Sequence, residues 1–175
     1  MNENKTNINW FPGHMAKAIR EIKEKLNIVD MVIEVCDSRA YKASINPIVQ
    51  ELSKNKFYLK VFTKIDLADE NVLKGIKEGY EKQNVSCVFV NLNNKDSIKP
   101  ITNMIKQVSK PLIEKDLKRG LKPRNVRVMV VGIPNVGKST LINLLAKRKS
   151  AGVGNMPGFT KSQKLVRCEG YDLLD

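Results

Sequence analysis

The chain has 175 residues, 42% of them apolar, so it is long enough for one well-buried domain but not for two. Its formal net charge is +13 at pH 7, which favours a partner that carries phosphate, such as RNA. The sequence shows no apolar run of about twenty residues and no signal-peptide pattern, so we expect a cytoplasmic protein without a membrane segment.

The first part of the chain predicts an alternation of helices and strands. Apolar residues at helical spacing indicate helices, and continuous runs rich in β-branched residues indicate buried strands. On this basis we expect helices over residues 14–27, 47–55, 69–83 and 97–119, and strands over residues 28–37, 57–64 and 87–91.

The second part begins with a short linker, residues 120–125, followed by an apolar strand over 126–131. A helix that ends near residue 149 comes next, and the Gly-rich residues 152–158 predict a mobile loop. Residues 164–168 and 171–174 predict a hairpin around Glu169-Gly170. The whole order predicts an α/β domain with a doubly wound, mostly parallel six-stranded sheet.

The segment from Gly132 to Ser139 reads Gly-Ile-Pro-Asn-Val-Gly-Lys-Ser and fits the phosphate loop of nucleotide triphosphatases. A predicted strand precedes it and a predicted helix follows it, which is the context that the motif requires. Glycines let backbone amides close around phosphate oxygens, and the helix N-terminus adds a positive field. We therefore predict that Lys138 binds the β and γ phosphates, that Ser139 holds Mg²⁺, and that neighbouring residues complete the nucleotide contacts: Asn135, Val136, Gly137 and Thr140.

A second motif, Thr63-Lys64-Ile65-Asp66, follows a predicted strand and matches the guanine-specificity motif Asn-Lys-x-Asp with Thr in place of Asn. The Asp66 carboxylate can accept two hydrogen bonds from guanine N1 and N2, which adenine does not offer in that pattern. The Lys64 stem would pack over the base. After the next strand, Asn91 and Leu92 stand where backbone amides of a GTPase contact the base, although Leu92 replaces the usual Ser.

The order of these motifs is unusual, because the guanine motif comes about seventy residues before the phosphate loop. The chain therefore resembles a circularly permuted GTPase with a Ras-like G domain. Residues 9–18 read Asn-Trp-Phe-Pro-Gly-His-Met-Ala-Lys-Ala and resemble the opening signature of the ribosome biogenesis GTPase A (RbgA, or YlqF) family. Asp37-Ser38-Arg39 resembles the Asp-Ala-Arg element of that family, and Pro157-Gly158-Phe159-Thr160 resembles its switch segment.

This resemblance implies a guanine nucleotide, GTP or GDP, with Mg²⁺ as the cofactors. Ser139 and Thr160 would hold the metal, and Asp175 would bind it through water. Hydrolysis would proceed by positioning and charge neutralisation at Lys138 and Thr160, with water as the nucleophile. His14 is a candidate to orient that water. The alternative is that His14 belongs to a docking segment in which it is a hydrogen-bonded surface residue.

The resemblance also suggests a single permuted G domain over residues 1–175. We divide it into a signature segment and helix (1–27), a guanine-specificity half (28–119), a linker (120–125), and a phosphate-loop and switch half (126–175). Asp175 resembles the first residue of the family's Asp-x-x-Gly motif, so we expect a fragment without the C-terminal RNA-binding domain, in preference to a natural short form.

Basic residues gather in two segments, with eight between positions 106 and 127 and six, without any acid, between 145 and 168. Contact with the RNA backbone is one interpretation, and a solvated face that aids solubility is the other. The linker is first a tether, although its basic residues could also touch RNA. By resemblance the partners are rRNA and a precursor of the large ribosomal subunit, with no membrane or DNA partner and a monomeric chain.

Two functions from different classes follow. The first is a GTPase that acts in late assembly of the large ribosomal subunit, as the resemblance implies. The second is a nucleotide-gated RNA-binding scaffold with negligible hydrolysis. A third hypothesis, an ATP-binding enzyme, would make Asp66 incidental to base recognition.

Overall fold

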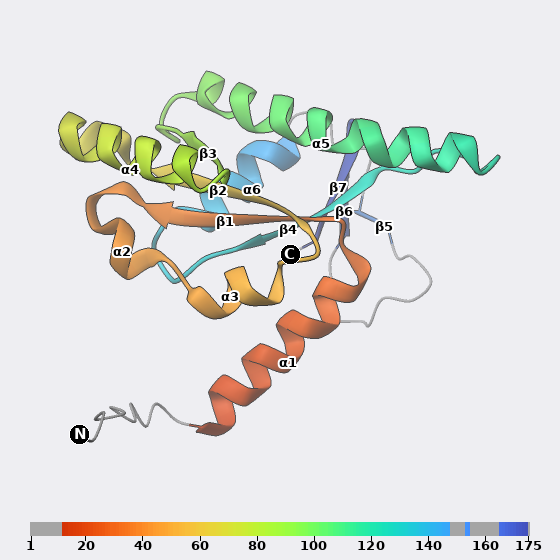
Figure 1. The fold of residues 1–175 in the computed structure, drawn as a ribbon, viewed down its shortest axis with the longest axis horizontal. Helices are drawn as coiled ribbons and strands as arrows, with labels where there is room; N and C mark the ends of the chain where they lie inside the picture. The colour runs from red at the N-terminus through yellow and green to blue at the C-terminus, as the bar shows by residue number, and fades with distance from the viewer. Residues whose placement is uncertain (1–11, 148–152, 155–164, 175) are drawn as a thin grey trace.

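The computed structural model describes residues 12–147, 153–154 and 165–174. They form one sheet with helices on both faces (Figure 1). The strands are β1 (Met31–Asp37), β2 (Phe57–Thr63), β3 (Ser86–Phe89), β4 (Val126–Val131), β5 (Val153–Gly154), β6 (Leu165–Cys168) and β7 (Tyr171–Leu174).

The strand order across the sheet is β3-β2-β1-β4-β7-β6-β5. The neighbours from β3 to β7 run parallel, whereas β6 pairs antiparallel with both β7 and β5. All six predicted strands are present, so the doubly wound, mostly parallel sheet is confirmed. The seventh strand, β5, was expected to be part of a loop, because two residues are too few to show a period. The rest of that predicted mobile loop lies outside the described residues.

The helices are α1 (Pro12–Ile28), α2 (Tyr41–Ser44), α3 (Pro47–Leu52), α4 (Glu70–Lys82), α5 (Lys99–Lys118) and α6 (Lys138–Lys147). Single 3₁₀ turns are η1 (Ser38–Ala40), η2 (Ile65–Leu67) and η3 (Lys95–Ile98). All the predicted helices occur, whereas η1 and α2 had no signal because they are so short. In the part of the chain that the structure describes, no helix is long and apolar enough to cross a membrane.

Local chemistry explains where several helices begin. Asp69 caps α4, since its carboxylate accepts hydrogen bonds from the amides of Asn71 and Val72. Asn46 caps α3 in the same way and is followed by Pro47, a residue suited to the first helical position. These caps fix the start of α3, which connects β1 to β2, and the start of α4, which connects β2 to β3.

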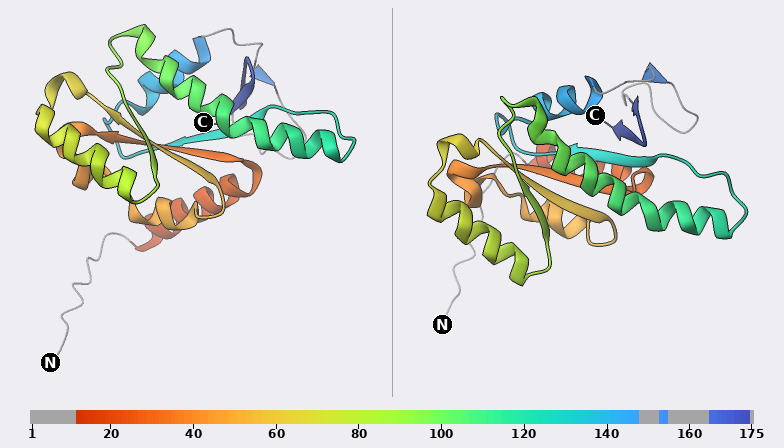
Figure 2. Two further views of the ribbon diagram at one scale, coloured as in Figure 1. Left: turned by 45° about the horizontal axis from the view of Figure 1, so that its top comes forward. Right: turned by 90° about the horizontal axis from the view of Figure 1, so that it is seen from above.

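The alternation of side chains along β1 divides the core into two layers. Met31, Ile33 and Val35 pack toward α5 and α6, whereas Val32 packs toward α1 and α3. The two helical layers lie on opposite sides of the sheet in both views of Figure 2. α4 covers the outer strands on the α1 side, where Ile76 packs with Phe62 and Cys36. The site described below lies at the carboxyl ends of the strands between these layers.

The core also holds a buried ion pair. The Glu34 carboxylate on β1 is 1% exposed and the Lys60 ammonium on β2 is 0% exposed, with 2.5 Å between Oε2 and Nζ. The Tyr58 hydroxyl donates to the same Oε2, and the amide of Asn46 donates to Oε1. Lys60 further lies over the rings of Tyr58 and Tyr80. The ion pair is thus enclosed by three residues, Asn46, Tyr58 and Tyr80.

At the opposite end of the sheet from the site, side chains fasten the segment that joins α5 to β4. The Arg124 guanidinium donates two hydrogen bonds to Asp30, of 2.6 and 2.8 Å, and the Arg127 amide donates to the same carboxylate. Asn125 Nδ2 donates to Asp172 on β7 at 2.9 Å. These contacts favour the tether interpretation of the linker.

Candidate nucleotide-binding site

The loop of residues 132–137 leaves the carboxyl end of β4 and leads directly into α6. Gly132 lies so close to β1 that an added Cβ would be 2.8 Å from the Val35 carbonyl oxygen. Gly137 has φ +97°, and a Cβ there would lie 3.0 Å from Leu92 Cδ1. Both glycines of the motif are therefore required by the backbone path, one by close approach and the other also by its left-handed conformation.

A hollow of about 600 Å³, which we call the phosphate hollow, lies in front of this loop at the N-terminus of α6. Free amides at a helix N-terminus and the positive end of the helix dipole favour an anion at this place. The lining includes five of the six predicted contacts, Asn135, Gly137, Lys138, Ser139 and Thr140. Gly132, Ile133, Pro134 and Lys64 complete it. Val136 differs from the others, because its side chain is buried in the core.

A second hollow, of about 240 Å³, lies between the segment after β2 and the segment after β3, and we call it the base hollow. The structure brings together here the residues predicted to read the base: Thr63, Lys64, Asp66, Asn91 and Leu92. Leu67 and Asn93 also line it and were not predicted. Each directly follows a residue of the two motifs, which is the signal that could have identified them. The two hollows share Lys64, Gly137 and Thr140 in their linings, so they lie next to each other.

Thr63, which stands in place of the usual Asn, is fully buried at the end of β2. Its Oγ1 lies 2.6 Å from the Val136 carbonyl oxygen and 3.1 Å from that of Cys36, and its one hydroxyl proton can be donated to either. The Thr hydroxyl therefore ties the guanine motif to the phosphate loop.

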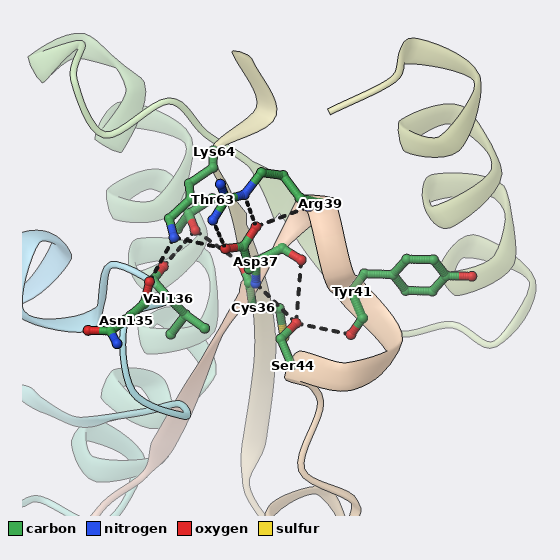
Figure 3. Close-up of polar contacts among 9 residues, drawn as sticks. All are labelled: Cys36, Asp37, Arg39, Tyr41, Ser44, Thr63, Lys64, Asn135 and Val136. Atoms are coloured by element: carbon green, nitrogen blue, oxygen red, sulfur yellow. Dashed lines mark hydrogen bonds and ion pairs between the residues drawn. The ribbon is translucent and has the colours of Figure 1, made fainter. Parts of the chain in front are cut away.

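Lys64 makes a second tie between the two motifs. Its Nζ donates to the Asn135 carbonyl oxygen at 2.7 Å and to Asp37 Oδ2 at 2.8 Å (Figure 3). Its backbone is left-handed, with φ 58° and ψ 35°, and this turn leads into η2, which carries Asp66. The ammonium thus lies between a carboxylate on β1 and the backbone of the phosphate loop.

The Asp37 carboxylate is only 12% exposed and collects several donors. Arg39 donates from its amide and from Nε to Oδ1, each at 3.0 Å, and from Nη2 to Oδ2 at 2.8 Å. The Arg39 guanidinium, and then the Lys64 ammonium, hold the pKa of Asp37 well below its usual range. This carboxylate therefore stays charged beside the site at any physiological pH.

Leu92 stands where a Ser is usual in GTPases. In the structure Leu92 packs against the core between the sheet and α5 and contacts the position of Gly137. The loop is braced by its neighbour, since Asn91 Oδ1 accepts the amide of Asn93 at 2.9 Å. The apolar contact of Leu92 and the Asx turn of Asn91 thus hold this loop in place of the usual Ser hydroxyl.

Three predicted residues fall outside what the structure describes. Thr160 and Asp175 are not among the described residues. His14 lies within α1, but its side chain is not described. Among the residues described, Ser139 at the start of α6 is the predicted metal ligand that lines the phosphate hollow. Its hydroxyl, with phosphate oxygens, suits Mg²⁺, which prefers oxygen ligands and keeps several waters.

A third hollow, of about 300 Å³, adjoins the phosphate loop and shares Gly132, Ile133 and Lys138 with the phosphate hollow. It lies between α1, α3 and β4, and Glu34 and Lys25 contribute to its lining. No pattern in the sequence predicts this hollow, because its walls come from elements far apart in the chain. Lys138 borders both this hollow and the phosphate hollow.

The C-terminal part of the chain, from β4 onward, is similar to a known protein family. Residues 127–175 match the family described as "50S ribosome-binding GTPase". The chain is 43% identical to ribosome biogenesis GTPase A of Bacillus licheniformis, over 96% of this chain and 60% of that protein. It is 39% identical to mitochondrial ribosome-associated GTPase 1 of Mus musculus, over 91% of this chain and 51% of that protein. The chain thus spans about half to three fifths of the length of these relatives.

The fold is also similar to solved structures of YlqF. The fold is similar to GNP-bound YlqF from T. maritima, with a TM-score of 0.58 and 27% identity over 90% of this chain and 56% of that one. It is also similar to the GDP-bound structure of the same protein, with a TM-score of 0.57 and 26% identity over 89% and 56%.

Proposed function

We propose that the chain, which is 43% identical to ribosome biogenesis GTPase A over 60% of that protein, belongs to that family, binds GTP and GDP, and hydrolyses GTP. One observation carries this proposal. The phosphate hollow and the base hollow adjoin each other and share Lys64, Gly137 and Thr140 in their linings. A mononucleotide has the shape to fill both, with its phosphates at α6 and its base beside Asp66.

Base selection is assigned to Asp66. Its carboxylate accepts hydrogen bonds from guanine N1 and N2, whereas adenine would leave it facing an acceptor. The ordered position of Lys64 supports this assignment, since its stem borders both hollows while its ammonium is held by Asp37 and Asn135. Asn91 and Leu92 close the other side of the base.

Hydrolysis is assigned to positioning and charge neutralisation around the phosphates. The Lys138 ammonium and the amides at the start of α6 offset charge on the β and γ oxygens. Ser139 and Thr160 would hold Mg²⁺, with Asp175 acting through water, and the metal would supply further charge stabilisation. His14 orients the attacking water in this proposal, and the docking role is its alternative.

We further propose that the protein acts in late assembly of the large ribosomal subunit, in the cytoplasm, through contact with rRNA. The names of its relatives support a ribosomal role. Six basic residues along α5 and the following linker are exposed and could face the RNA backbone: Lys106, Lys110, Lys115, Lys118, Arg119 and Lys122. Arg124 is a poorer candidate, because Asp30 already holds its guanidinium.

The first test is an equilibrium titration of the chain with fluorescent GDP in the presence of Mg²⁺. Unlabelled GTP and GDP are expected to displace the probe, whereas ATP and ADP are not. Equal displacement by ADP would favour the ATP-binding hypothesis, and absence of any binding would contradict the assignment of the site.

A second test measures phosphate release with and without large-subunit particles. Stimulated release is the expected result for a GTPase that acts in assembly. Nucleotide-dependent RNA binding without release of phosphate would instead favour the scaffold.

A further inference from the structure

We propose that Asp37 is a positioning residue for guanine-nucleotide binding, which acts by holding Lys64 between the base hollow and the phosphate loop. The inference rests on the proposed function and assigns a role to the Asp37-Ser38-Arg39 element, which the nucleotide assignment above does not use. Asp37 lines neither hollow, so any effect on the nucleotide passes through another side chain.

The position of Lys64 requires outside support. Its left-handed backbone is unfavourable for a residue with a side chain, so this turn persists only where surrounding contacts determine it. The side chain provides two such contacts, one to the Asn135 carbonyl oxygen and one to the Asp37 carboxylate. Both are charge-assisted because the ammonium is ionised, but only the second is an ion pair, with a charge on each partner.

Asp37 is itself fixed from several directions. Its amide donates to Ser44 Oγ at 3.0 Å, and its carboxylate receives the Arg39 amide and guanidinium (Figure 3). Of the cations that it binds, Lys64 alone borders the two hollows. The rigid end of β1 therefore supplies a fixed anion against which the guanine motif and the phosphate loop are aligned.

The competing explanation is structural. Asp37 also joins η1 and α2 to β1, so its loss could simply loosen that turn. The two explanations differ in one respect. If Asp37 acts through Lys64, its removal has no further effect on nucleotide affinity once the Lys64 ammonium is gone, whereas a structural role would persist in that background.

The experiment is a double-mutant cycle with Asp37→Asn, Lys64→Met and the double variant, read out as the Kd for fluorescent GDP. Asp37→Asn keeps an oxygen at Oδ1 for the Arg39 amide and Nε. It places an NH₂ group where Oδ2 now accepts from both Arg39 Nη2 and Lys64 Nζ. We expect it to weaken GDP binding about tenfold, and less than about twofold in the Lys64→Met background. Melting temperatures without nucleotide report any loosening of the turn.

A matched control is available in Asp96→Asn. Asp96 pairs with Lys99 at 2.8 Å, the distance of the Asp37–Lys64 pair, but both partners are exposed and lie outside the two hollows. GDP affinity is expected to be unchanged in this variant. If it fell as far as in Asp37→Asn, a general effect of charge would explain both results and the inference would be wrong.

Equal losses of affinity in the two Lys64 backgrounds would overturn the positioning role, and so would no loss at all. If Asp37→Asn does not fold, the same cycle is run with Asp37→Glu, which keeps the charge but moves the carboxylate by one methylene. The same pattern is required of it. Failure of the unmodified chain to bind GDP would instead overturn the proposed function, so the two failures are distinguishable.

Discussion

The buried pair of Glu34 and Lys60 makes a quantitative prediction about stability. In Lys60→Met the side-chain stem is nearly conserved, but the Glu34 carboxylate loses its counterion while 1% exposed. Leaving one charge of a buried pair uncompensated costs about 3–5 kcal/mol. At about 2–4 °C per kcal/mol for a chain of this size, the melting temperature should fall by roughly 6–20 °C.

The assay is thermal unfolding followed by circular dichroism, with two companion variants. Adding Glu34→Gln to Lys60→Met removes both charges, so the double variant should regain most of the lost stability. Lys77→Met breaks an ion pair of 4.0 Å whose partners are each 62% exposed, and it should change stability by less than about 0.5 kcal/mol. If Lys60→Met melts like the unmodified chain, the pair is not a buried charge pair. If the double variant is as unstable as the single one, lost packing explains the effect and the charge argument fails.

Three other predictions concern the site. Lys138→Ala should weaken GDP binding by at least about a hundredfold in the fluorescent titration, because a charge-assisted contact with the phosphates is lost; affinity within a few-fold of the original would contradict the phosphate-loop assignment. Asp66→Asn should shift base preference from guanine toward xanthine in competition assays, since the amide donates where the carboxylate accepted; unchanged selectivity would mean that another residue reads the base. The Arg39 and Lys64 cations lower the pKa of Asp37, so its stabilising contribution is present above its ordinary pKa of 3.8 and is lost as the pH falls below that value. Melting temperatures should therefore decline more steeply below about pH 4 in the unmodified chain than in Asp37→Asn, and parallel curves would count against this linkage.

The sequence predicted those parts of the molecule that have a periodic pattern of apolar residues or carry a motif. The strands, the long helices and the hairpin of β6 and β7 follow from periodicity and turn residues. The two motifs predicted most of the lining of the phosphate hollow and the base hollow. The two residues of β5 and the four of α2 are too short for a period to register.

The contacts that the sequence could not predict join residues far apart in the chain. Thr63 meets Val136 across 73 positions and Lys64 meets Asn135 across 71, and no local pattern announces either contact. The replacement of Asn by Thr at position 63 was visible, but its consequence was not. Only the fold shows that the shorter hydroxyl still reaches the phosphate loop.

The strand order explains why these long-range ties matter. The strands before the linker form one block, β3-β2-β1, and those after it form another, β4-β7-β6-β5. Among the described strands, the two blocks are hydrogen-bonded to each other through β1 and β4. The covalent connection from α5 to β4, with Arg124 fastened to Asp30, lies at the far end of that seam from the site. The base hollow belongs mainly to the first block, whereas the phosphate hollow belongs mainly to the second. A nucleotide that occupies both would therefore bridge the seam at its open end, beside the bonds from Thr63 and Lys64 that already cross it. Nucleotide binding and the alignment of the two blocks would then be thermodynamically linked. Through that link the Asp37 carboxylate would change the affinity for the nucleotide without contacting it.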